Sequence, residues 1–329
     1  MVAPLAALMA LAGCSVTGPQ SVDEAQAHPL AGQIWDVRSG EFIDYATLLA
    51  EAARVRQLLI GEIHINPEHH RIQARIIEDL AFQRTPMTLV LEIFEQDQQE
   101  AISRAAADPQ ATTETIASAT DIRDSGWDWE SYEPLVGLAL QKGVSIRAGN
   151  APRAQVNEIA RKGPGVIPED RLTALGLSTP LPSSAEAALT ETIVDSHCGH
   201  VFGDMTGRLI AAQRLRDATM ADVMLASRPD TTVLITGSGH ARRDYGVPHY
   251  ILARDPSATV LSIGLRETRD RQENPADYVD QLEGLDVPFD YLWFTSRTVS
   301  EDPCEQFRES LEELRRRGAG APPEASEGP

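Results

Sequence analysis

Basic residues, aromatic residues and cysteines are scarce in this sequence of 329 residues. The 29 Lys and Arg residues are outnumbered by 49 Asp and Glu residues, so the net charge is −20, and the chain has three cysteines. Because no basic patch is available to neutralise phosphates, nucleic acid is excluded as an expected partner. No internal stretch is long and apolar enough to predict a transmembrane helix. The hydrophobic content of 42% instead indicates a globular protein with a large core.

The first cysteine ends an apolar N-terminal segment. Leu11-Ala12-Gly13-Cys14 resembles a bacterial lipobox, in which the cysteine is lipidated after the signal segment is removed. This pattern predicts a signal segment over residues 1–14 and a flexible tether over residues 15–30, and Ser15 favours the outer membrane. The expected localisation is the bacterial cell envelope, with membrane contact through the lipid anchor only. A chance cysteine in an apolar N-terminus is the alternative.

The other two cysteines are Cys198 and Cys304. Outside the cytoplasm such a pair can form a disulfide. The sequence does not show whether they lie close together, so paired and free cysteines both stay open. The short cluster His197-Cys198-Gly199-His200 lacks a matching second pair of ligands and is weak evidence for a metal site.

Strand-like and helix-like segments alternate along most of the chain. This alternation predicts an α/β fold with a mostly parallel sheet flanked by helices, over residues 31–317. Residues 163–226 carry helical patterns without strands and are interpreted as an inserted helical subdomain, and residues 318–329 as a disordered tail. The strands are expected at residues 57–61, 88–92, 144–146, 232–236, 250–253, 259–263 and 291–294. The main helices are expected at residues 45–55, from 66 onward, 95–107, 130–142, 184–197, 203–226 and 304–317.

Two of the expected strands end in the same pattern of a glycine, two residues and a histidine. Gly61-Glu62-Ile63-His64 follows one apolar run, and Gly237-Ser238-Gly239-His240 follows another. A third run, Leu89-Val90-Leu91, ends in Glu92. Open parallel sheets bind ligands beyond the carboxyl ends of their strands. The four acidic and histidine side chains are therefore expected to converge on one site.

Carboxylates and imidazoles in such a group can act as acid and base, or can ligate a divalent metal ion. The candidate catalytic and metal-binding set is accordingly Glu62, His64, Glu92 and His240. The alternatives are a surface ion pair between Glu62 and His64, and a Glu92 side chain that caps the following helix.

Two neighbouring histidines add to this set. His69 and His70 fall in the first turn of a predicted helix that begins near Asn66-Pro67-Glu68. The positive end of the helix dipole lowers a histidine pKa and favours the neutral imidazole that ligates metals. Solvated histidines at a helix start are the alternative.

Polar residues also interrupt an apolar stripe on the helix predicted at residues 203–226. Gln213 and Asp217 share one face with Met220 and Met224, which favours a helix that covers a polar site. The alternative is a boundary helix on which Asp217 pairs with Arg214. Trp127-Asp128-Trp129 with Tyr132 can wall a flat apolar ligand, or form a packing corner.

Several motifs, taken in order, resemble those of one known family. The resemblance covers roughly residues 33–263 and identifies the chain as similar to the ChaN-like haem-binding lipoproteins. The motifs are Gly61-Glu62-Ile63-His64-Ile65-Asn66-Pro67-Glu68-His69-His70, Leu91-Glu92-Ile93-Phe94, Trp127-Asp128-Trp129, Gly149-Asn150-Ala151-Pro152-Arg153 and Gly237-Ser238-Gly239-His240-Ala241-Arg242.

The resemblance implies a lipid-anchored protein that binds haem in haem or iron uptake or storage. It also implies haem held between two protomers with tyrosine ligation of the iron, an outer-membrane haem receptor as partner, and a homodimer. Tyr132, which lies inside a matching motif, is the first candidate ligand, and Tyr245 is the second. The remaining candidate haem contacts are His64, His69, His70, Asn150, Gln213 and His240.

The same glutamates and histidines also look like those of the wider superfamily of Tiki proteases and erythromycin-esterase-like proteins. That resemblance implies the second function that we consider, a metal-dependent hydrolase of a small ester or peptide. In this interpretation Glu62, His64, Glu92 and His240 surround a divalent metal ion or an activated water.

Overall fold

A computed structural model describes residues 28–83, 86–200, 203–227, 231–280, 286–298 and 304–305. The predicted signal segment with Cys14, most of the predicted tether, nearly all of the predicted helix 304–317 and the predicted tail lie outside these residues. Within the described part of the chain, we find no helix that combines the length and the apolar character needed to cross a membrane.

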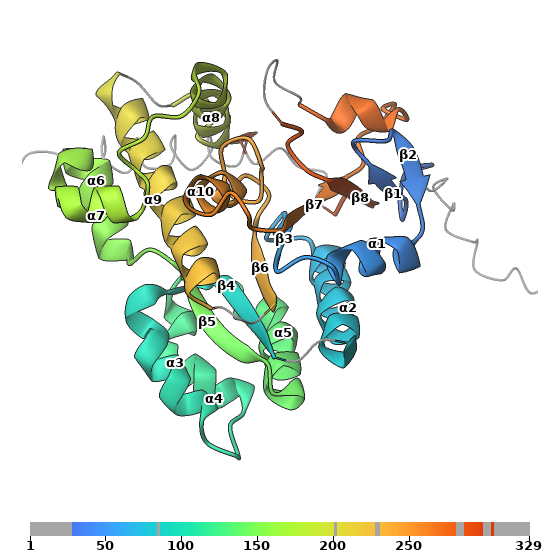
Figure 1. Ribbon diagram of the computed structural model, residues 1–329, viewed down its shortest axis with the longest axis horizontal. Coiled ribbons are helices and arrows are strands. Elements are labelled where there is room, and N and C mark those ends of the chain that lie inside the picture. Colours follow the sequence, from blue (N-terminus) through green and yellow to red (C-terminus); the bar gives the residue numbers. More distant parts are fainter. Residues whose placement is uncertain are drawn as a thin grey trace, which may run out of the picture.

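The described residues form one eight-stranded sheet with the strand order β2-β1-β8-β7-β3-β6-β4-β5 (Figure 1). The strands from β8 to β5 run parallel to one another, and β1 and β2 add an antiparallel edge. The predicted α/β class with a mostly parallel sheet is thereby confirmed. The strands are β1 Ile34–Asp36, β2 Glu41–Ile43, β3 Gln57–Glu62, β4 Met87–Glu95, β5 Ser145–Asn150, β6 Thr231–Gly237, β7 Val260–Glu267 and β8 Tyr291–Thr295.

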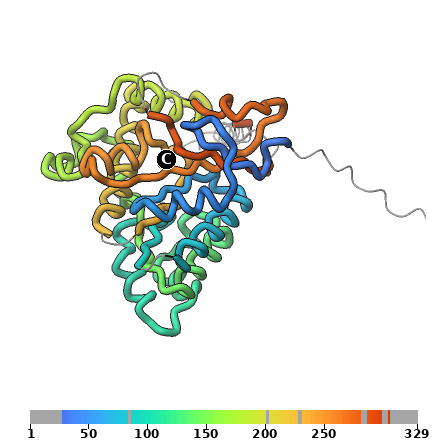
Figure 2. Tube along the Cα trace, turned by 45° about the vertical axis from the view of Figure 1, so that its right-hand side comes forward, coloured from blue at the N-terminus to red at the C-terminus, as the bar shows by residue number. Residues whose placement is uncertain are grey.

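Helices cover both faces of the sheet. The helices between residues 45 and 142 gather on one side of the molecule, and those between residues 153 and 226 gather on the other (Figure 2). The helices are α1 Tyr45–Ala52, α2 Pro67–Gln83, α3 Gln99–Ala106, α4 Thr113–Thr120, α5 Trp129–Lys142, α6 Arg153–Lys162, α7 Glu169–Ala174, α8 Ser183–Ser196, α9 Asp204–Ala226 and α10 Val247–Arg254.

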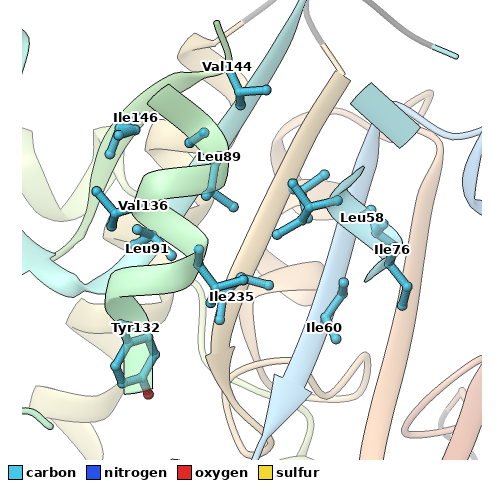
Figure 3. Packing of buried hydrophobic residues seen from close by; sticks show 14 of the residues in the cluster. Leu58, Ile60, Ile76, Leu89, Leu91, Tyr132, Val136, Val144, Ile146 and Ile235 are labelled. Atoms are coloured by element: carbon cyan, nitrogen blue, oxygen red, sulfur yellow. The ribbon is translucent and has the colours of Figure 1, made fainter. Parts of the chain in front are cut away.

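Each face of the sheet has its own hydrophobic core. Side chains alternate along a strand, so Leu58 and Ile60 of β3 face the layer of α2 and α5, and Leu59 faces the layer of α9. Figure 3 shows the first core, where Ile76 of α2 and Val136 of α5 pack against the strands. Because both faces are covered, the central strands β3 and β6 are buried along their whole length, and polar side chains gather where they end.

The predicted helical region between residues 163 and 226 contains α7, α8 and α9, and no strand occurs among its described residues. Helix α9 packs against α6, α10 and β5, and so belongs to the layer that covers the sheet. The structure also joins Cys198, just after α8, to Cys304 in a disulfide with the Cα atoms 5.4 Å apart. The question of paired or free cysteines is thereby answered for this structure.

One predicted strand is wrong. Residues 250–253 lie in helix α10, which begins at Val247 and carries Pro248 in its first turn. Proline is well tolerated there because the first helical N–H groups have no partner inside the helix. The apolar run that follows fits a short buried helix as well as it fits a strand. The antiparallel edge formed by β1 and β2 was not predicted, because each of these strands has only three residues.

Candidate functional site

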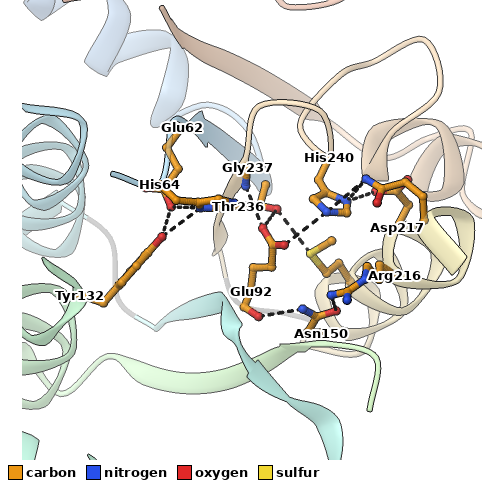
Figure 4. Close-up of polar contacts among 12 residues, drawn as sticks. Glu62, His64, Glu92, Tyr132, Asn150, Arg216, Asp217, Thr236, Gly237 and His240 are labelled. Carbon is orange, nitrogen blue, oxygen red and sulfur yellow. Dashed lines mark hydrogen bonds and ion pairs between the residues drawn. The ribbon is translucent and has the colours of Figure 1, made fainter. Parts of the chain in front are cut away.

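The two Gly-x-x-His patterns lie side by side. Strands β3 and β6 are neighbours, with Gly61 opposite Thr236 and Glu62 opposite Gly237. A Cβ atom on Gly61 would lie 2.8 Å from the Cβ of Ala241, so a glycine is required for the segment after β6 to pack this closely. Strand β4 pairs with β6 on its other side and contributes Glu92. The structure therefore brings the four predicted side chains to one edge of the sheet (Figure 4).

Glu62 and His64 form the first pair. The Nδ1 atom of His64 lies 2.9 Å from Oε1 of Glu62 and 3.0 Å from the hydroxyl oxygen of Tyr132. The Tyr132 hydroxyl donates a short hydrogen bond to the same Glu62 oxygen. Gln73 of α2 donates to the other oxygen, Oε2, at 2.6 Å. These contacts hold a buried carboxylate in place, and the carboxylate fixes the orientation of the His64 ring.

His64 is the accessible member of this pair. Its side chain is 39% exposed, whereas that of Glu62 is 1% exposed. Among the described residues, its Nε2 atom has no hydrogen-bond partner, and it would lie 2.9 Å from a Cβ atom on Gly237. The edge of Trp127 packs against the ring at a centroid distance of 4.9 Å. Although burial lowers the His64 pKa, the hydrogen bond to Glu62 and the charge of Glu92 raise it above its usual value.

Glu92 and His240 form the second pair, and this pair is buried. Glu92 accepts hydrogen bonds at Oε2 from the Thr236 hydroxyl at 2.7 Å and from the Gly237 backbone N–H at 2.8 Å. Its Oε1 atom lies 3.3 Å from Nε2 of His240. The Nδ1 atom of His240 donates to Oδ1 of Asp217 at 2.5 Å. Glu92 thus faces the crevice, and the alternative of a helix cap finds no support in these contacts.

Glu92, His240 and Asp217 form one buried group, and their pKa values are shifted in different directions by burial and by one another's charges. Burial lowers the pKa of His240, but Glu92 and Asp217 outweigh it and raise the pKa to about 10. Burial raises the pKa of Asp217 to about 6, even though the nearby His240 lowers it. Burial raises the pKa of Glu92, but the charge and hydrogen bond of His240 outweigh this effect, so the Glu92 pKa stays below its usual range. At neutral pH the group is therefore an imidazolium between two carboxylates.

Helix α9 covers this second pair, as its mixed stripe predicted. Asp217 is fully buried, and the Gln213 amide nitrogen lies 3.1 Å from Nδ1 of His240. Arg214 instead donates to the Tyr250 hydroxyl at 2.8 Å, so the alternative of an Asp217–Arg214 pair is wrong. Asn150 lies at the rim, where it donates to the Glu92 carbonyl oxygen at 3.1 Å and accepts from Arg216 at 3.0 Å.

Two of the predicted haem contacts do not reach the crevice. His69 is fully buried, accepts a hydrogen bond from the Ile63 N–H at 2.9 Å and contacts the Thr295 hydroxyl through Nε2 at 2.9 Å. Burial, His70 and Arg266 lower its pKa to about 3, so it stays neutral. Tyr245 is buried under α8 with its hydroxyl 3.0 Å from that of Thr192. The polar atoms of both side chains are therefore engaged by neighbouring protein groups.

His70 and Tyr132 lie one layer behind His64. His70 donates from Nε2 to the His64 carbonyl oxygen at 2.9 Å, and its ring packs on the Tyr132 ring at a centroid distance of 4.6 Å. Tyr132 is 1% exposed, and its hydroxyl is committed to Glu62. Burial and the Glu62 charge raise its pKa far above the usual value, which opposes the phenolate that iron ligation needs. This arrangement favours Tyr132 as a support for Glu62 and His64.

No group of three or more His, Cys, Asp or Glu side chains is arranged to hold a metal ion within the described residues. The predicted set of four instead divides into two carboxylate–histidine pairs, with Thr236 and Gly237 between them (Figure 4). Sequence reasoning missed two members of the site, Gln73 and Thr236. Gln73 lies on the buried face of α2, and its helical spacing from His69 and His70 is a signal that could have indicated it.

Comparisons with known proteins agree with this fold. The family model described as haem-binding uptake, Tiki superfamily, ChaN matches residues 48–251. No curated protein matches the sequence significantly. Among solved structures, one that describes cofacial haem binding to ChaN of Campylobacter jejuni has 19% identity and a TM-score of 0.63, and covers 79% of this chain and 95% of its own. A mutant of the erythromycin esterase EreC has 13% identity, a TM-score of 0.38, and coverage of 81% and 82%.

The family match covers more than half of the chain and includes both strand-end histidines, Glu62, Glu92 and α9. The motifs that carry the resemblance in the sequence lie at one edge of one sheet. This protein belongs to the ChaN family of the Tiki superfamily.

Proposed function

We propose that this protein binds haem at the carboxyl end of β3, with Nε2 of His64 as an axial ligand of the iron. When bound, haem supplies a ferric iron that accepts such a ligand. The observation that carries the proposal is the state of His64, which is partly exposed, oriented by a buried carboxylate through Nδ1, and uncommitted at Nε2. Ligating histidines commonly have a carboxylate on the other ring nitrogen. The family description and the cofacial haem binding described for Campylobacter jejuni ChaN support haem as the ligand.

Trp127 and Ile65 are apolar side chains beside His64, the first in space and the second in sequence. Trp127 contacts the His64 ring edge-on, and Ile65 is 60% exposed although it is a large aliphatic residue. An exposed and a partly exposed apolar side chain, beside an imidazole nitrogen that has no partner among the described residues, suit contact with a flat, apolar porphyrin. We include both in the proposed haem contact surface.

The test is a haemin titration of the purified protein, followed by absorbance. We expect a saturable Soret shift that persists in His197→Ala, which removes an exposed histidine on the distant end of α8. A Soret shift that does not saturate, or that is lost in His197→Ala, would indicate nonspecific binding and contradict the proposal.

We further propose that the protein acts at the cell envelope, anchored by lipid at Cys14, and that it relays or stores haem for uptake. The lipobox supports the anchor, and the family description supports uptake. An outer-membrane haem receptor and a second copy of the chain are the proposed partners. Membrane fractionation tests the anchor: the full chain should follow the membranes, and Cys14→Ser should release it. Retention of Cys14→Ser in the membrane would contradict lipidation at this residue.

A hydrolase is the second candidate, favoured by one observation. The Glu62–His64 pair has the geometry of a general base and its orienting carboxylate, and Nε2 points toward Gly237 beside Glu92. In this candidate mechanism, His64 activates water directly as the base that Glu62 orients. Hydrolysis of a panel of small esters and peptides, lost in both His64→Ala and Glu62→Gln, would support this function. Equal background rates in all three proteins would reject it.

A further inference from the structure

A second cavity lies apart from the His64 crevice, between α8 and the segments that follow β6 and β7. Its volume is about 330 Å³, in the range of small-molecule pockets. One wall contains Arg242 and Arg269 with the single carboxylate of Asp280, and is called the basic wall. The acidic wall on α8 contains Glu191 and Asp195. Helix α8 lies at the upper edge of the molecule in Figure 1. The cavity thus opens at the carboxyl ends of two parallel strands, where ligands of such sheets bind.

The basic wall is built around a buried arginine. The Arg242 side chain is 7% exposed, and its Nε and Nη2 atoms donate to Asp244 at 3.0 and 2.6 Å. Among the described residues, its remaining nitrogen, Nη1, has a carboxylate oxygen of Asp280 at 3.8 Å, which is too long for a hydrogen bond. Arg269 has no carboxylate partner in the described part of the chain, and its guanidinium contacts Gln272 at 3.4 Å. Two guanidinium groups therefore keep donors free on this wall.

A third arginine, Arg266, adds positive charge behind the basic wall. Arg266 stacks on the Phe289 ring at 4.7 Å and has no carboxylate partner among the described residues. Burial lowers its pKa to about 10, and repulsion from the nearby Arg242 charge contributes to this shift. Asp244 balances one of the three charges, and the 69%-exposed Asp280 balances a second only weakly. An anionic group in the cavity would relieve this repulsion.

The acidic wall carries an excess of negative charge. Ala188, Glu191, Thr192 and Asp195 follow each other at helical spacing, so they form one face of α8 toward the cavity. Neither Glu191 nor Asp195 takes part in a salt bridge with a described residue. Their carboxylates also do not come within salt-bridge distance of Arg242 or Arg269 across the cavity. The two walls therefore hold opposite charges that the protein itself leaves apart.

We propose that this cavity binds a small zwitterion, with its carboxylate or phosphate group on the Arg242–Arg269 wall and its ammonium group on the Glu191–Asp195 wall. A molecule with both charges satisfies both walls at once, whereas a simple anion or cation satisfies one and is repelled by the other. Free amino acids, dipeptides and phosphoethanolamine share this chemistry. The site is separate from the proposed haem ligand and does not depend on it.

Calorimetric titration of the full chain with alanyl-alanine, its N-acetyl derivative, its C-terminal amide and phosphoethanolamine tests the proposal. We expect at least one zwitterion to bind in the millimolar range or tighter, and both blocked dipeptides to bind at least about tenfold more weakly than alanyl-alanine if the carboxylate form is preferred. Tighter binding of phosphoethanolamine than of alanyl-alanine would support the site with phosphate as its anionic group. Equal affinity for the dipeptide and both blocked forms, or no heat with either zwitterion, would overturn the proposal.

Two variants test whether the zwitterion binds in this cavity. Arg269→Gln removes the exposed member of the basic wall, and Glu191→Gln with Asp195→Asn neutralises the acidic wall without changing side-chain size. Each should weaken zwitterion binding by about tenfold, while Glu186→Gln, on another face of α8, should leave it unchanged. Unchanged affinity in both wall variants would refute the site. Haemin titration of Arg269→Gln should match the wild type, which keeps this result distinct from the proposed function.

Discussion

Two neighbouring strands, β3 and β6, end in the same short pattern, yet their histidines occupy different environments. His64 is partly exposed and is held by one carboxylate, and its Nε2 has no hydrogen-bond partner in the described part of the chain. His240 is 7% exposed and lies between two carboxylates, under the cover of α9. The difference comes from the elements packed above each strand end. One histidine is therefore available to a ligand, while the other maintains the charge balance of the crevice.

The largest effect should follow the loss of His240. In His240→Ala, Glu92 and Asp217 would remain buried without their shared cation, and the protein should lose about 3–5 kcal/mol of unfolding free energy. His64→Ala should lose about 1 kcal/mol or less, because its ring is partly exposed. Denaturation in urea measures both values. Equal losses in the two variants would remove the distinction between the histidines.

The pH dependence of stability should report the same buried imidazolium. The folded pKa of His240, about 10, exceeds the unfolded value of about 6.5, so its contribution is complete below about pH 6.5 and is lost as the pH rises toward 10. Between about pH 7.5 and 9.5, the unfolding free energy should fall by up to about 1.4 kcal/mol per pH unit. Asp217, with a pKa of about 6, has titrated below this window. His240→Gln should flatten the slope, and an unchanged slope would show that His240 is neutral in the folded protein.

A moderate effect is expected from the hydroxyl group behind His64. Tyr132→Phe removes a donor to Glu62 and should lower the unfolding free energy by about 1–2 kcal/mol. Tyr45→Phe is a matched control, because the Tyr45 hydroxyl donates to Asp79 at 2.6 Å away from the site. Only Tyr132→Phe should weaken haemin binding, without abolishing it. Complete loss of haem ligation in Tyr132→Phe, together with its persistence in His64→Ala, would make Tyr132 the ligand after all.

The smallest change tests the position of the His64 ring. Gly237→Ala places a Cβ atom 2.9 Å from Nε2 of His64, so the ring must rotate toward solvent. Haemin affinity should fall about tenfold, equivalent to about 1.4 kcal/mol, with little loss of stability. Gly239→Ala, where an added Cβ meets no atom within 4 Å, should have no effect. An unchanged affinity in Gly237→Ala would show that the observed ring position is not the one that binds haem.

The sequence was sufficient to predict the parallel strands of the sheet and the convergence of their ends, but not the antiparallel edge. Buried apolar runs that end in Gly61 and Gly237 allow few other arrangements in an alternating β-α-β chain. The partners of each histidine were harder to predict. The stripe on α9 left open whether Asp217 covers a polar site or pairs with Arg214, and its partner comes from a strand end 23 residues further on. Such contacts depend on how α9 crosses the sheet, which helical periodicity does not specify.

The exposure of the candidate side chains also could not be predicted from the sequence. His69 and His70 are adjacent in one helical turn, yet one contacts Ile63 and Thr295 and the other supports His64. Tyr132 lies in a matching motif, but only the packing of α5 against α2 shows that its hydroxyl is committed to Glu62. The pairing of Cys198 with Cys304 joins residues 106 positions apart, and spacing alone does not favour it. Local pattern thus located the site, and tertiary packing determined which side chain is available.

The absorbance spectrum of His64→Ala titrated with haemin, with and without added imidazole, tests the central claim most directly. If Nε2 of His64 is the axial ligand, the variant should lose the saturable Soret shift of the wild type, and free imidazole should restore a wild-type-like spectrum by filling the space left by the side chain. An unchanged Soret band and affinity in His64→Ala would contradict the account, because the accessible histidine of the crevice would then have no part in holding the iron.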